Sequence, residues 1–395
     1  MTILLSPLQN DRPLPKQSRK LRLGIIGGGR ISNIQAAAAR MTGRWDISAG
    51  VFSSDPKKAK DASQLWNLDK KKCYTSPEEM ITEEFKSNNP IDAVMITTPN
   101  HLHFQHSKIF LENNVHVLCD KPMTSNLDEA IELNNLVKNS NSIFGVSYVM
   151  SCFPMVRQAR ELVLQGVVGE INQIHVEFFQ DWMVDSSVEE APHVKWRLDP
   201  KKSGKTSCVG DIGTHAAHLA QFISGKKLTH VKADFHVCGS PKELEDTAFM
   251  NTKYDDQIPG TLMITRLASG KRGGLKIRIY GSKGGLEWDM EENEKLKISR
   301  YGSADEIYTR GHGNGISKNI DRYLMSARGF SEGIVEAWGI LYTELALSVC
   351  LKINNENISS DLLLPTVKDG LNGLKFIEAS FNSSQNNGIW TSLNI

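Results

Sequence analysis

The chain has no long apolar run and almost no net charge. No window approaches the roughly 20 apolar residues that span a bilayer. The N-terminal MTILLSPLQNDRPLPKQSRK has only a short apolar run before prolines and charges, whereas a secretory signal needs a longer one. Lysine and arginine number 46, and aspartate and glutamate 45, a balance that gives no general attraction to phosphodiester backbones or anionic lipid. We therefore expect neither a nucleic-acid nor a membrane partner.

Cysteine is also scarce. The six cysteines are widely scattered and form no C-x-x-C pair, which is typical of reduced thiols rather than of a disulfide framework. We therefore expect a cytoplasmic protein. A chain of 395 residues exceeds the size at which one hydrophobic core usually keeps growing, so two domains are expected.

Short apolar runs alternate with helical stretches from Leu21 onward. LRLGIIG, WDISAGVF, IDAVMITT, VHVLC and SIFGVSY have the character of strands, and helix-like segments separate them. Such a βαβ pattern predicts a parallel sheet that is covered on both faces. We predict an α/β fold with a doubly wound Rossmann domain over residues 21–147, preceded by an N-terminal arm of residues 1–20.

The pattern changes after about residue 150. Helices are expected at 155–164 and 212–223, and long strand-like runs such as INQIHVEFF and LKIRIYG follow. In these runs apolar residues alternate with polar ones, which predicts a large open, mostly antiparallel sheet with one buried face. A polar loop is expected at 305–318, and helices at 332–351 and 364–380. Residues 148–395 therefore form a predicted α+β domain for substrate binding, whose uncovered sheet face predicts a homodimer or homotetramer.

The segment LGIIGGGRIS follows a predicted strand and opens a predicted helix. Gly27 and Gly29 take the first two positions of G-x-G-x-x-G, and Ser32 takes the third. The first glycine permits a tight turn, and the second lets the backbone approach a pyrophosphate at the helix N-terminus, where Arg30 and Ile31 lie. The pattern in this context predicts a dinucleotide cofactor, NAD(P), although glycine runs also occur in ordinary turns.

The end of the second predicted strand bears on the choice between NAD and NADP. An acidic residue there would bind both ribose hydroxyls, but the chain has Ser53 and Ser54, followed by Lys57 and Lys58. Hydroxyls beside cations suit a 2′-phosphate, which gives a slight preference for NADP or for dual use. The alternative is that Asp55 reaches the ribose and that the lysines are simply solvated.

Four ordered motifs together give the chain a family resemblance: the glycine turn, TTPNHLH (97–103), CDKPM (119–123) and GDIGTHAAHL (210–219). The chain resembles the glucose-fructose oxidoreductase, inositol dehydrogenase and rhizopine-catabolism family, or Gfo/Idh/MocA. The tracts VFSSDP, QDW and WR resemble the branch that includes levoglucosan dehydrogenase. The resemblance implies hydride transfer between a sugar, inositol or anhydrosugar hydroxyl and the nicotinamide.

The resemblance also implies roles for individual residues. Lys121 would hold both the reacting hydroxyl and the cofactor, and Asp211 and His215 would complete the catalytic set. Residues four apart share a helix face, so Asp211 can position or polarise His215. The remaining residues expected at the cofactor are Thr98, Pro99, Asn100, His103 and Asp120.

Simpler interpretations of these residues remain open. Asp211 and His215 also fit a surface pair or a helix cap, and Lys121 an ordinary loop lysine. A metal site is an alternative for His215 with His218 and Asp211, or for the histidines at 101, 103 and 106. Neither cluster includes a thiolate, and we predict no metal.

Substrate contacts are expected from four further residues. Aromatic faces pack on sugar C–H surfaces, and amide or guanidinium groups bind hydroxyls, which suggests Gln180, Trp182, His193 and Arg197. The chain departs from the family at Asp120, where a glutamate is usual, and at YVMS (148–151), where F-N-Y-R is common. Two other functions remain open, namely an NAD-dependent glycosidase acting by redox-assisted elimination and a non-catalytic dinucleotide-binding sensor.

Overall fold

The computed structural model describes residues 14–311 and 316–395, so residues 1–13 of the predicted arm lie outside the described residues. The described chain forms two compact units. The first contains the described residues up to Thr124 with Asp128–Ser147 and Ile334–Leu371, and the second contains Ser125–Leu127, Tyr148–Gly333 and Asn372–Ile395. The sequence placed one boundary after residue 147; the structure adds residues 334–371 to the first unit, because helix α11 (Ile334–Ile353) packs against helix α1 (Arg30–Met41).

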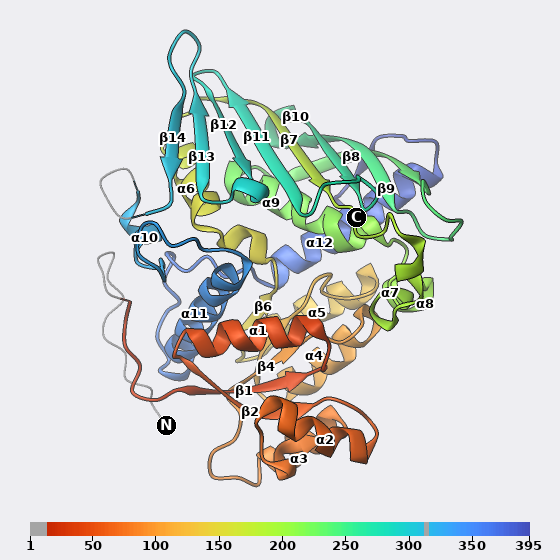
Figure 1. Cartoon of the computed structure of the whole chain (residues 1–395), viewed down its shortest axis with the longest axis vertical. Coiled ribbons are helices and arrows are strands. Elements are labelled where there is room, and N and C mark those ends of the chain that lie inside the picture. Colours follow the sequence, from red (N-terminus) through yellow and green to blue (C-terminus); the bar gives the residue numbers. More distant parts are fainter. Residues whose placement is uncertain (1–13, 312–315) are drawn as a thin grey trace. The chain divides into compact units, whose positions relative to one another are not determined.

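A parallel sheet forms the centre of the first unit (Figure 1). Its strands are β1 (Leu21–Ile26), β2 (Trp45–Val51), β3 (Cys73–Tyr74), β4 (Ala93–Ile96), β5 (His116–Cys119) and β6 (Phe144–Val146). They lie in the order β3-β2-β1-β4-β5-β6, and each neighbouring pair is parallel. The strand order reverses between β1 and β4, which is the arrangement of dinucleotide-binding sheets. The predicted Rossmann sheet is confirmed.

Helices connect and cover these strands. They are α1 (Arg30–Met41), α2 (Pro56–Trp66), α3 (Pro77–Glu84), α4 (His103–Glu112), α5 (Leu127–Asn139) and α11 (Ile334–Ile353). Local sequence explains where several begin. Asp55 caps α2, and the Ser76 hydroxyl accepts a hydrogen bond from the Glu79 amide at the start of α3, each followed by a proline in the first turn.

Helix α11 is the most apolar helix of the first unit. Within the described residues it alone is long and apolar enough to cross a membrane, which the sequence analysis had not expected, but 83% of its apolar window is buried inside the protein. It packs beside α1. The indole N–H of Trp45 donates to the Tyr342 carbonyl oxygen at 2.9 Å, and the Tyr342 hydroxyl donates to Gln35 Oε1 at 2.8 Å. These contacts identify α11 as a core helix that covers the sheet.

A large open sheet dominates the second unit. Its strands are β7 (Ile171–Phe179), β8 (Leu228–His236), β9 (Thr247–Tyr254), β10 (Pro259–Thr265), β11 (Gly274–Gly281), β12 (Gly285–Asp289), β13 (Lys295–Ser299), β14 (Glu306–Thr309) and β15 (Thr391–Ser392). The order is β14-β13-β12-β11-β7-β10-β9-β8-β15. Among the described strands β7 and β10 pair in parallel and the other neighbours antiparallel. The predicted open, mostly antiparallel sheet is confirmed.

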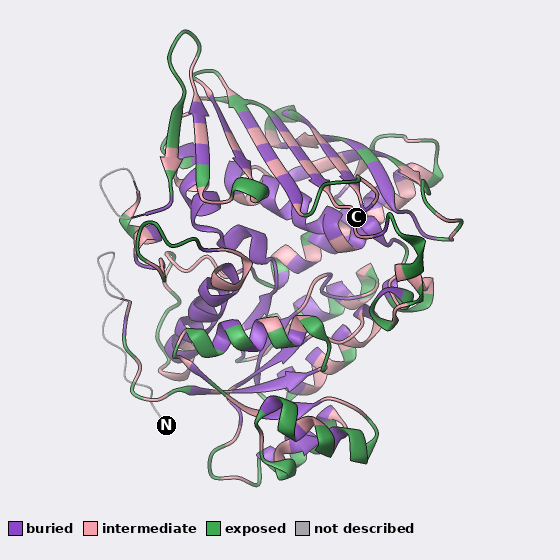
Figure 2. Cartoon of the chain, in the orientation of Figure 1, coloured by how far each residue is buried: buried purple, intermediate pink, exposed green. Residues whose placement is uncertain are grey.

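One face of this sheet is buried under helices. Bands of buried and more exposed residues alternate along its strands (Figure 2). The helices of this part of the chain are α6 (Pro154–Leu164), α7 (Pro192–Lys195), α8 (Pro200–Ser203), α9 (Thr214–Ser224), α10 (Lys318–Asp321) and α12 (Val367–Gln385). Helices α6 and α9 pack on the inner face. The opposite face carries ion pairs, such as that of Arg278 with Glu177 at 2.7 Å.

Two sequence expectations need correction. The stretch 305–318 was expected to be a loop, but it contains the edge strand β14, which pairs with β13; residues 312–315 lie outside the described residues. The helix expected at 212–223 is α9, which begins at Thr214 and is preceded by the π-helical turn Val209–Gly213. The widened turn was not predicted, because the apolar spacing does not distinguish it from an α-helix.

Candidate active site

The glycine turn lies between β1 and α1. Gly27 has φ +112°, and a Cβ there would lie 2.9 Å from Thr97 Oγ1. This position therefore requires glycine. Gly29 has an ordinary φ of −76°, and apart from its neighbours in the chain no described residue has an atom within 4 Å of the position that a Cβ would take. The open space in front of Gly29 leaves room for a phosphate to approach the backbone.

The first turn of α1 lies beside this open space. The amides of its first residues, including Arg30 and Ile31, have no partner within the helix, and the turn contains no acidic side chain. A helix N-terminus of this kind favours an anion. Ser32 is fully buried, and its Oγ lies 2.6 Å from Thr97 Oγ1, so the small third residue of the motif ties α1 to the end of β4. These residues fit a dinucleotide pyrophosphate.

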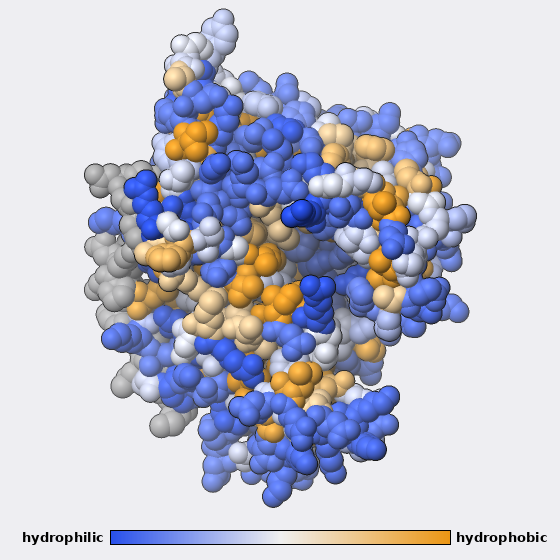
Figure 3. Space-filling model, viewed as in Figure 1, coloured by the Kyte–Doolittle hydropathy of each residue, from blue (hydrophilic) through white to orange (hydrophobic). Residues whose placement is uncertain are grey.

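The loop after β2 contains the residues expected at the ribose. Asp55 Oδ1 accepts hydrogen bonds from the amides of Lys58 at 3.0 Å and Lys57 at 2.8 Å. These bonds lower the pKa of Asp55, the bond from Lys58 most strongly. Ser53 Oγ accepts from the Asp55 amide at 3.1 Å, and the Ser54, Lys57 and Lys58 side chains are exposed. Mostly hydrophilic side chains cover the surface around α2 and α3 (Figure 3).

His103 joins two loops of the first unit. Its Nδ1 lies 2.8 Å from the Pro122 carbonyl oxygen, and its Nε2 lies 2.7 Å from the Thr98 carbonyl oxygen. Burial lowers its pKa. Both ring nitrogens thus face the backbone of the loops after β4 and β5, and the cofactor contact expected of His103 stays a prediction. The buried Asn100 begins the 3₁₀ turn Asn100–Leu102, directly after Thr98 and Pro99.

Lys121 lies in the loop after β5. Asp120 Oδ1 accepts a hydrogen bond from the Lys121 amide at 2.9 Å, and the Lys121–Pro122 peptide is cis. Strands β1, β4 and β5 are parallel neighbours. Gly27, Thr98 and Lys121 therefore lie at the same edge of the sheet, the carboxyl edge, where ligands bind in open α/β folds.

The second unit carries Asp211 and His215 at the start of α9. Asp211 belongs to the π-helical turn, a feature common at functional sites, and His215 to the first turn of α9. His215 is 6% exposed, and its ring meets Tyr148 edge-on at 5.7 Å. His218 stacks on the same tyrosine at 4.3 Å. Tyr148 thus packs against both histidines.

Arg266 binds Asp211 of the π-helical turn. Its Nη2 donates to Asp211 Oδ2 at 2.8 Å and to the Ser207 carbonyl oxygen at 3.0 Å, and its Nη1 donates to Ser207 Oγ at 2.7 Å. The guanidinium lies 5.2 Å from the centre of the Trp182 ring. Arg266 is fully buried. It therefore links the predicted catalytic aspartate to a predicted substrate residue.

Glu245 holds the backbone of the same segment. Its carboxylate accepts hydrogen bonds from the Val209 amide at 2.8 Å and the Ser207 amide at 3.0 Å. Burial raises the pKa of Glu245 to about 7, although these amides and Arg266 oppose the shift. The turn that carries Asp211 is thus held by Arg266, which binds the Asp211 side chain and Ser207, and by the buried Glu245 carboxyl, which binds backbone amides.

The other predicted substrate residues lie partly in this cluster. Trp182 Nε1 donates to Gln180 Oε1 at 2.8 Å. Arg197 Nε lies 3.8 Å from Asp211 Oδ2, and the Arg197 guanidinium lies over the Trp196 ring. Arg197 also donates to the carbonyl oxygen of His193, whose side chain is exposed. Gln180, Trp182 and Arg197 therefore lie near Asp211 through direct contacts or through Arg266, whereas His193 joins them only through its backbone.

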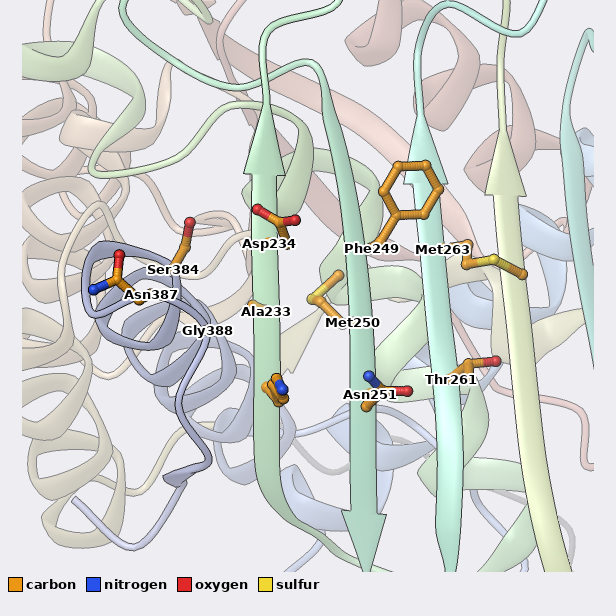
Figure 4. Close-up of a pocket in the computed structure, with 11 residues that line it drawn as sticks. Ala233, Asp234, Phe249, Met250, Asn251, Thr261, Met263, Ser384, Asn387 and Gly388 are labelled. Carbon is orange, nitrogen blue, oxygen red and sulfur yellow. The ribbon is translucent and has the colours of Figure 1, made fainter.

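A pocket elsewhere on the second unit contains none of the predicted site residues. It has a volume of about 620 Å³ and lies on the outer face of β8, β9 and β10, where Phe249 and Met263 project toward it, beside Asn387 and Gly388 after α12 (Figure 4). Among the described residues no group of three histidine, cysteine or acidic side chains has an arrangement that could hold a metal ion.

Two family models match consecutive parts of the chain. Residues 21–148 match the oxidoreductase family with an NAD-binding Rossmann fold, and residues 156–287 match the GFO/IDH/MocA C-terminal domain. The chain belongs to the Gfo/Idh/MocA oxidoreductase family. The resemblance drawn from the four motifs is thereby confirmed, and the chain is an NAD(P)-dependent dehydrogenase by family.

Individual members of the Gfo/Idh/MocA family match nearly the whole chain. The oxidoreductase YfiI of Bacillus subtilis is 30% identical, with 94% of this chain and 97% of YfiI covered. The levoglucosan dehydrogenase of Pseudarthrobacter phenanthrenivorans is 24% identical, with 82% and 86% covered. The crystal structure of an inositol dehydrogenase homolog from Azotobacter vinelandii, complexed with NAD⁺, matches with a TM-score of 0.89 at 26% identity, covering 95% of this chain and 98% of that one.

Four residues of this Gfo/Idh/MocA site were missed by the sequence analysis: Arg266, Glu245, Tyr148 and His218, the last named only as a candidate metal ligand. A signal for Arg266 existed. In TLMITRL the inward positions Leu262 and Ile264 are fully buried, and the same period places Arg266 inward, where an unpaired charge is costly. Glu245 has no such signal, because it lies in a loop whose path depends on tertiary structure.

Proposed function

We propose that this protein transfers a hydride between a hydroxyl of a sugar, inositol or anhydrosugar and a nicotinamide dinucleotide. The observation that carries the proposal is the open space in front of Gly29 at the N-terminus of α1, with Lys121 at the same carboxyl edge of the sheet. The substrate class is supported by the names of two relatives, a levoglucosan dehydrogenase and an inositol dehydrogenase homolog.

The chain's own side chains would manage the proton and the charge on the reacting oxygen. The nicotinamide, when bound, accepts or supplies the hydride. We assign to Lys121 the stabilisation of negative charge that develops on the hydroxyl oxygen. His215 would take the hydroxyl proton, since imidazole exchanges protons near neutral pH. Asp211, held by Arg266, would orient and polarise the groups around it.

The cofactor contacts follow the edge of the sheet. We propose that Gly27, Gly29, Arg30 and Ile31 bind the pyrophosphate, and that Thr98, Pro99, Asn100, Asp120 and Lys121 face the nicotinamide half. His103 would support the loops after β4 and β5, because its ring nitrogens already face backbone carbonyl oxygens.

At the ribose we retain a slight preference for NADP. Asp55 is engaged in capping α2, and Ser53, Ser54 and Lys58 lie beside it with Lys58 exposed. A carboxylate committed to its helix cap is less suited to bind two ribose hydroxyls. The exposed lysine side chain can pair with a 2′-phosphate.

The substrate would lie against the cluster around Asp211. Trp182 offers an aromatic face, with its ring oriented by Gln180, and Arg197 offers guanidinium donors for hydroxyl groups. His193, exposed on α7, is the fourth proposed contact. We further propose a cytoplasmic homodimer or homotetramer that buries the outer face of the open sheet, where Phe249 is 49% exposed.

A spectrophotometric screen of sugars, inositols and anhydrosugars with NAD and NADP tests the proposal. Absorbance change at the nicotinamide band is expected with at least one substrate. His215→Ala should lower kcat at least about a hundredfold with little change in cofactor affinity, whereas His236→Ala at the end of strand β8 should behave as wild type. Release of an aglycone without net cofactor turnover would instead identify a glycosidase. Cofactor binding with no turnover of any compound would identify a sensor.

A further inference from the structure

We propose that Arg266 is the positioning residue of the second unit's site, and that it fixes the Asp211 carboxylate and the Trp182 ring in one arrangement. The inference rests on the proposed catalytic role of Asp211. It adds a residue that none of the four sequence motifs contains. Arg266 follows β10, 55 residues after Asp211 in the chain.

The geometry uses properties that only arginine has. A guanidinium is planar, stays charged and presents several N–H donors in a fixed fork. Here Nη2 reaches both Asp211 Oδ2 and the Ser207 carbonyl oxygen, while Nη1 reaches Ser207 Oγ. These bonds fix the orientation of the guanidinium plane. With the plane fixed, the face of the guanidinium that packs near the Trp182 ring is fixed as well.

Burial makes this arrangement costly to lose. The Arg266 side chain is 0% exposed, whereas that of Asp211 is 21% exposed. A charge-assisted hydrogen bond is stronger away from water, and a buried arginine without its partner would leave an uncompensated charge. Arg266 therefore holds Asp211 from the protein interior, while 21% of the Asp211 side chain remains exposed to solvent.

Arg197 differs from Arg266 in its relation to the same carboxylate. Its Nε lies 3.8 Å from Asp211 Oδ2, beyond hydrogen-bonding distance, and its side chain is 28% exposed. Arg266 lies at 2.8 Å and is fully buried. The two arginines thus have separate tasks: Arg266 fixes the carboxylate, and Arg197 is available to a ligand.

The experiment is a double-mutant cycle with Arg266→Lys, Asp211→Asn and the combined variant. Lysine keeps the positive charge but offers one nitrogen in place of the fork. Arg266→Lys should lower kcat by about tenfold to a hundredfold, because small misplacements of a catalytic group have such effects, and should leave cofactor affinity unchanged. In the Asp211→Asn background the same substitution should change kcat less than about twofold. Arg278→Lys, at an ion-paired arginine on β11, is the matched control and should stay near wild type.

Each other outcome overturns one part of the reasoning. If Arg266→Lys lowers kcat by the same factor in both backgrounds, or leaves it unchanged, Arg266 is not the positioning residue of Asp211. If wild type turns over substrate and Asp211→Asn keeps full kcat, the proposed role of Asp211 fails instead. The free energies of unfolding of the same four proteins can be measured without a substrate. Coupling between the two substitutions supports the positioning of Asp211 by Arg266, and additivity overturns it.

Discussion

Glu245 makes the stability of the second unit depend on pH in a predictable direction. Burial raises the pKa of Glu245 from 4.5 to about 7, so the folded chain binds its proton more tightly than the unfolded chain does. The stabilisation that this proton gives is fully present below pH 4.5. It is lost as the pH rises from 4.5 through about 7.

The size of the effect follows from the shift. A change from 4.5 to about 7 corresponds to roughly 3 kcal/mol between the two protonation states. Glu245→Gln keeps a similar shape and an oxygen that can accept from the Ser207 and Val209 amides, but it cannot ionise. The free energy of unfolding of the variant minus that of wild type should therefore rise by roughly 2 to 3 kcal/mol between pH 5 and pH 8.

Urea unfolding at pH 5, 6, 7 and 8, followed by tryptophan fluorescence, measures this difference. Glu292→Gln is the matched control, because Glu292 is an exposed glutamate of the same unit, and its curve should run parallel to that of wild type. A constant difference between Glu245→Gln and wild type across the whole range would refute the reasoning. So would a difference that shrinks as the pH rises.

Three further predictions concern the cofactor site and the sheet face. Gly29→Ala should leave the melting temperature unchanged, because its Cβ would contact no described residue beyond its neighbours in the chain, but should raise the Kd of the dinucleotide at least about tenfold. Gly27→Ala, at φ +112°, should instead cost about 1 to 3 kcal/mol of stability. Lys58→Ala should raise KM for NADP by about fivefold and KM for NAD by less than about twofold. Lys60→Ala is the control. Equal effects of Lys58→Ala on both cofactors would argue against a 2′-phosphate contact. Phe249→Asp should convert the proposed oligomer to a monomer in light scattering at micromolar concentration, and a wild-type monomer would contradict the proposal outright.

The sequence predicted the first unit well because its signals are local. A strand, a glycine turn and a helix follow one another between Leu21 and Met41, so the phosphate site can be recognised without knowledge of any distant residue. The same holds for the loops at Thr98 and Lys121. The sequence could not predict that residues 334–371 join this unit, since the position of α11 is set by contacts such as that of Tyr342 with Gln35.

Local spacing predicted less of the second unit. The interval between Asp211 and His215 indicated one helix face, but the structure has a π-helical turn there, and Asp211 binds Arg266. Tyr148 illustrates the same limit. In the sequence, the tract YVMS departs from the family pattern and suggested that the usual substrate contacts are missing. In the structure, the Tyr148 ring packs against His215 and His218. Contacts between residues far apart in the chain decide both cases.

The parallel pairing of β7 and β10 explains how these distant residues meet. In an antiparallel pair, neighbouring strands end at opposite edges, but parallel strands end at the same edge. Thr265 pairs with Phe179 at the ends of the two strands. The tract that contains Gln180 and Trp182 therefore leaves the sheet beside Arg266. The Gln180 amide then donates to the Thr265 carbonyl oxygen at 2.9 Å, and the Met183 amide to that of Arg266 at 3.2 Å. A reversal of either strand would separate the arginine from the tryptophan, which makes this pairing the structural basis of the proposed substrate site.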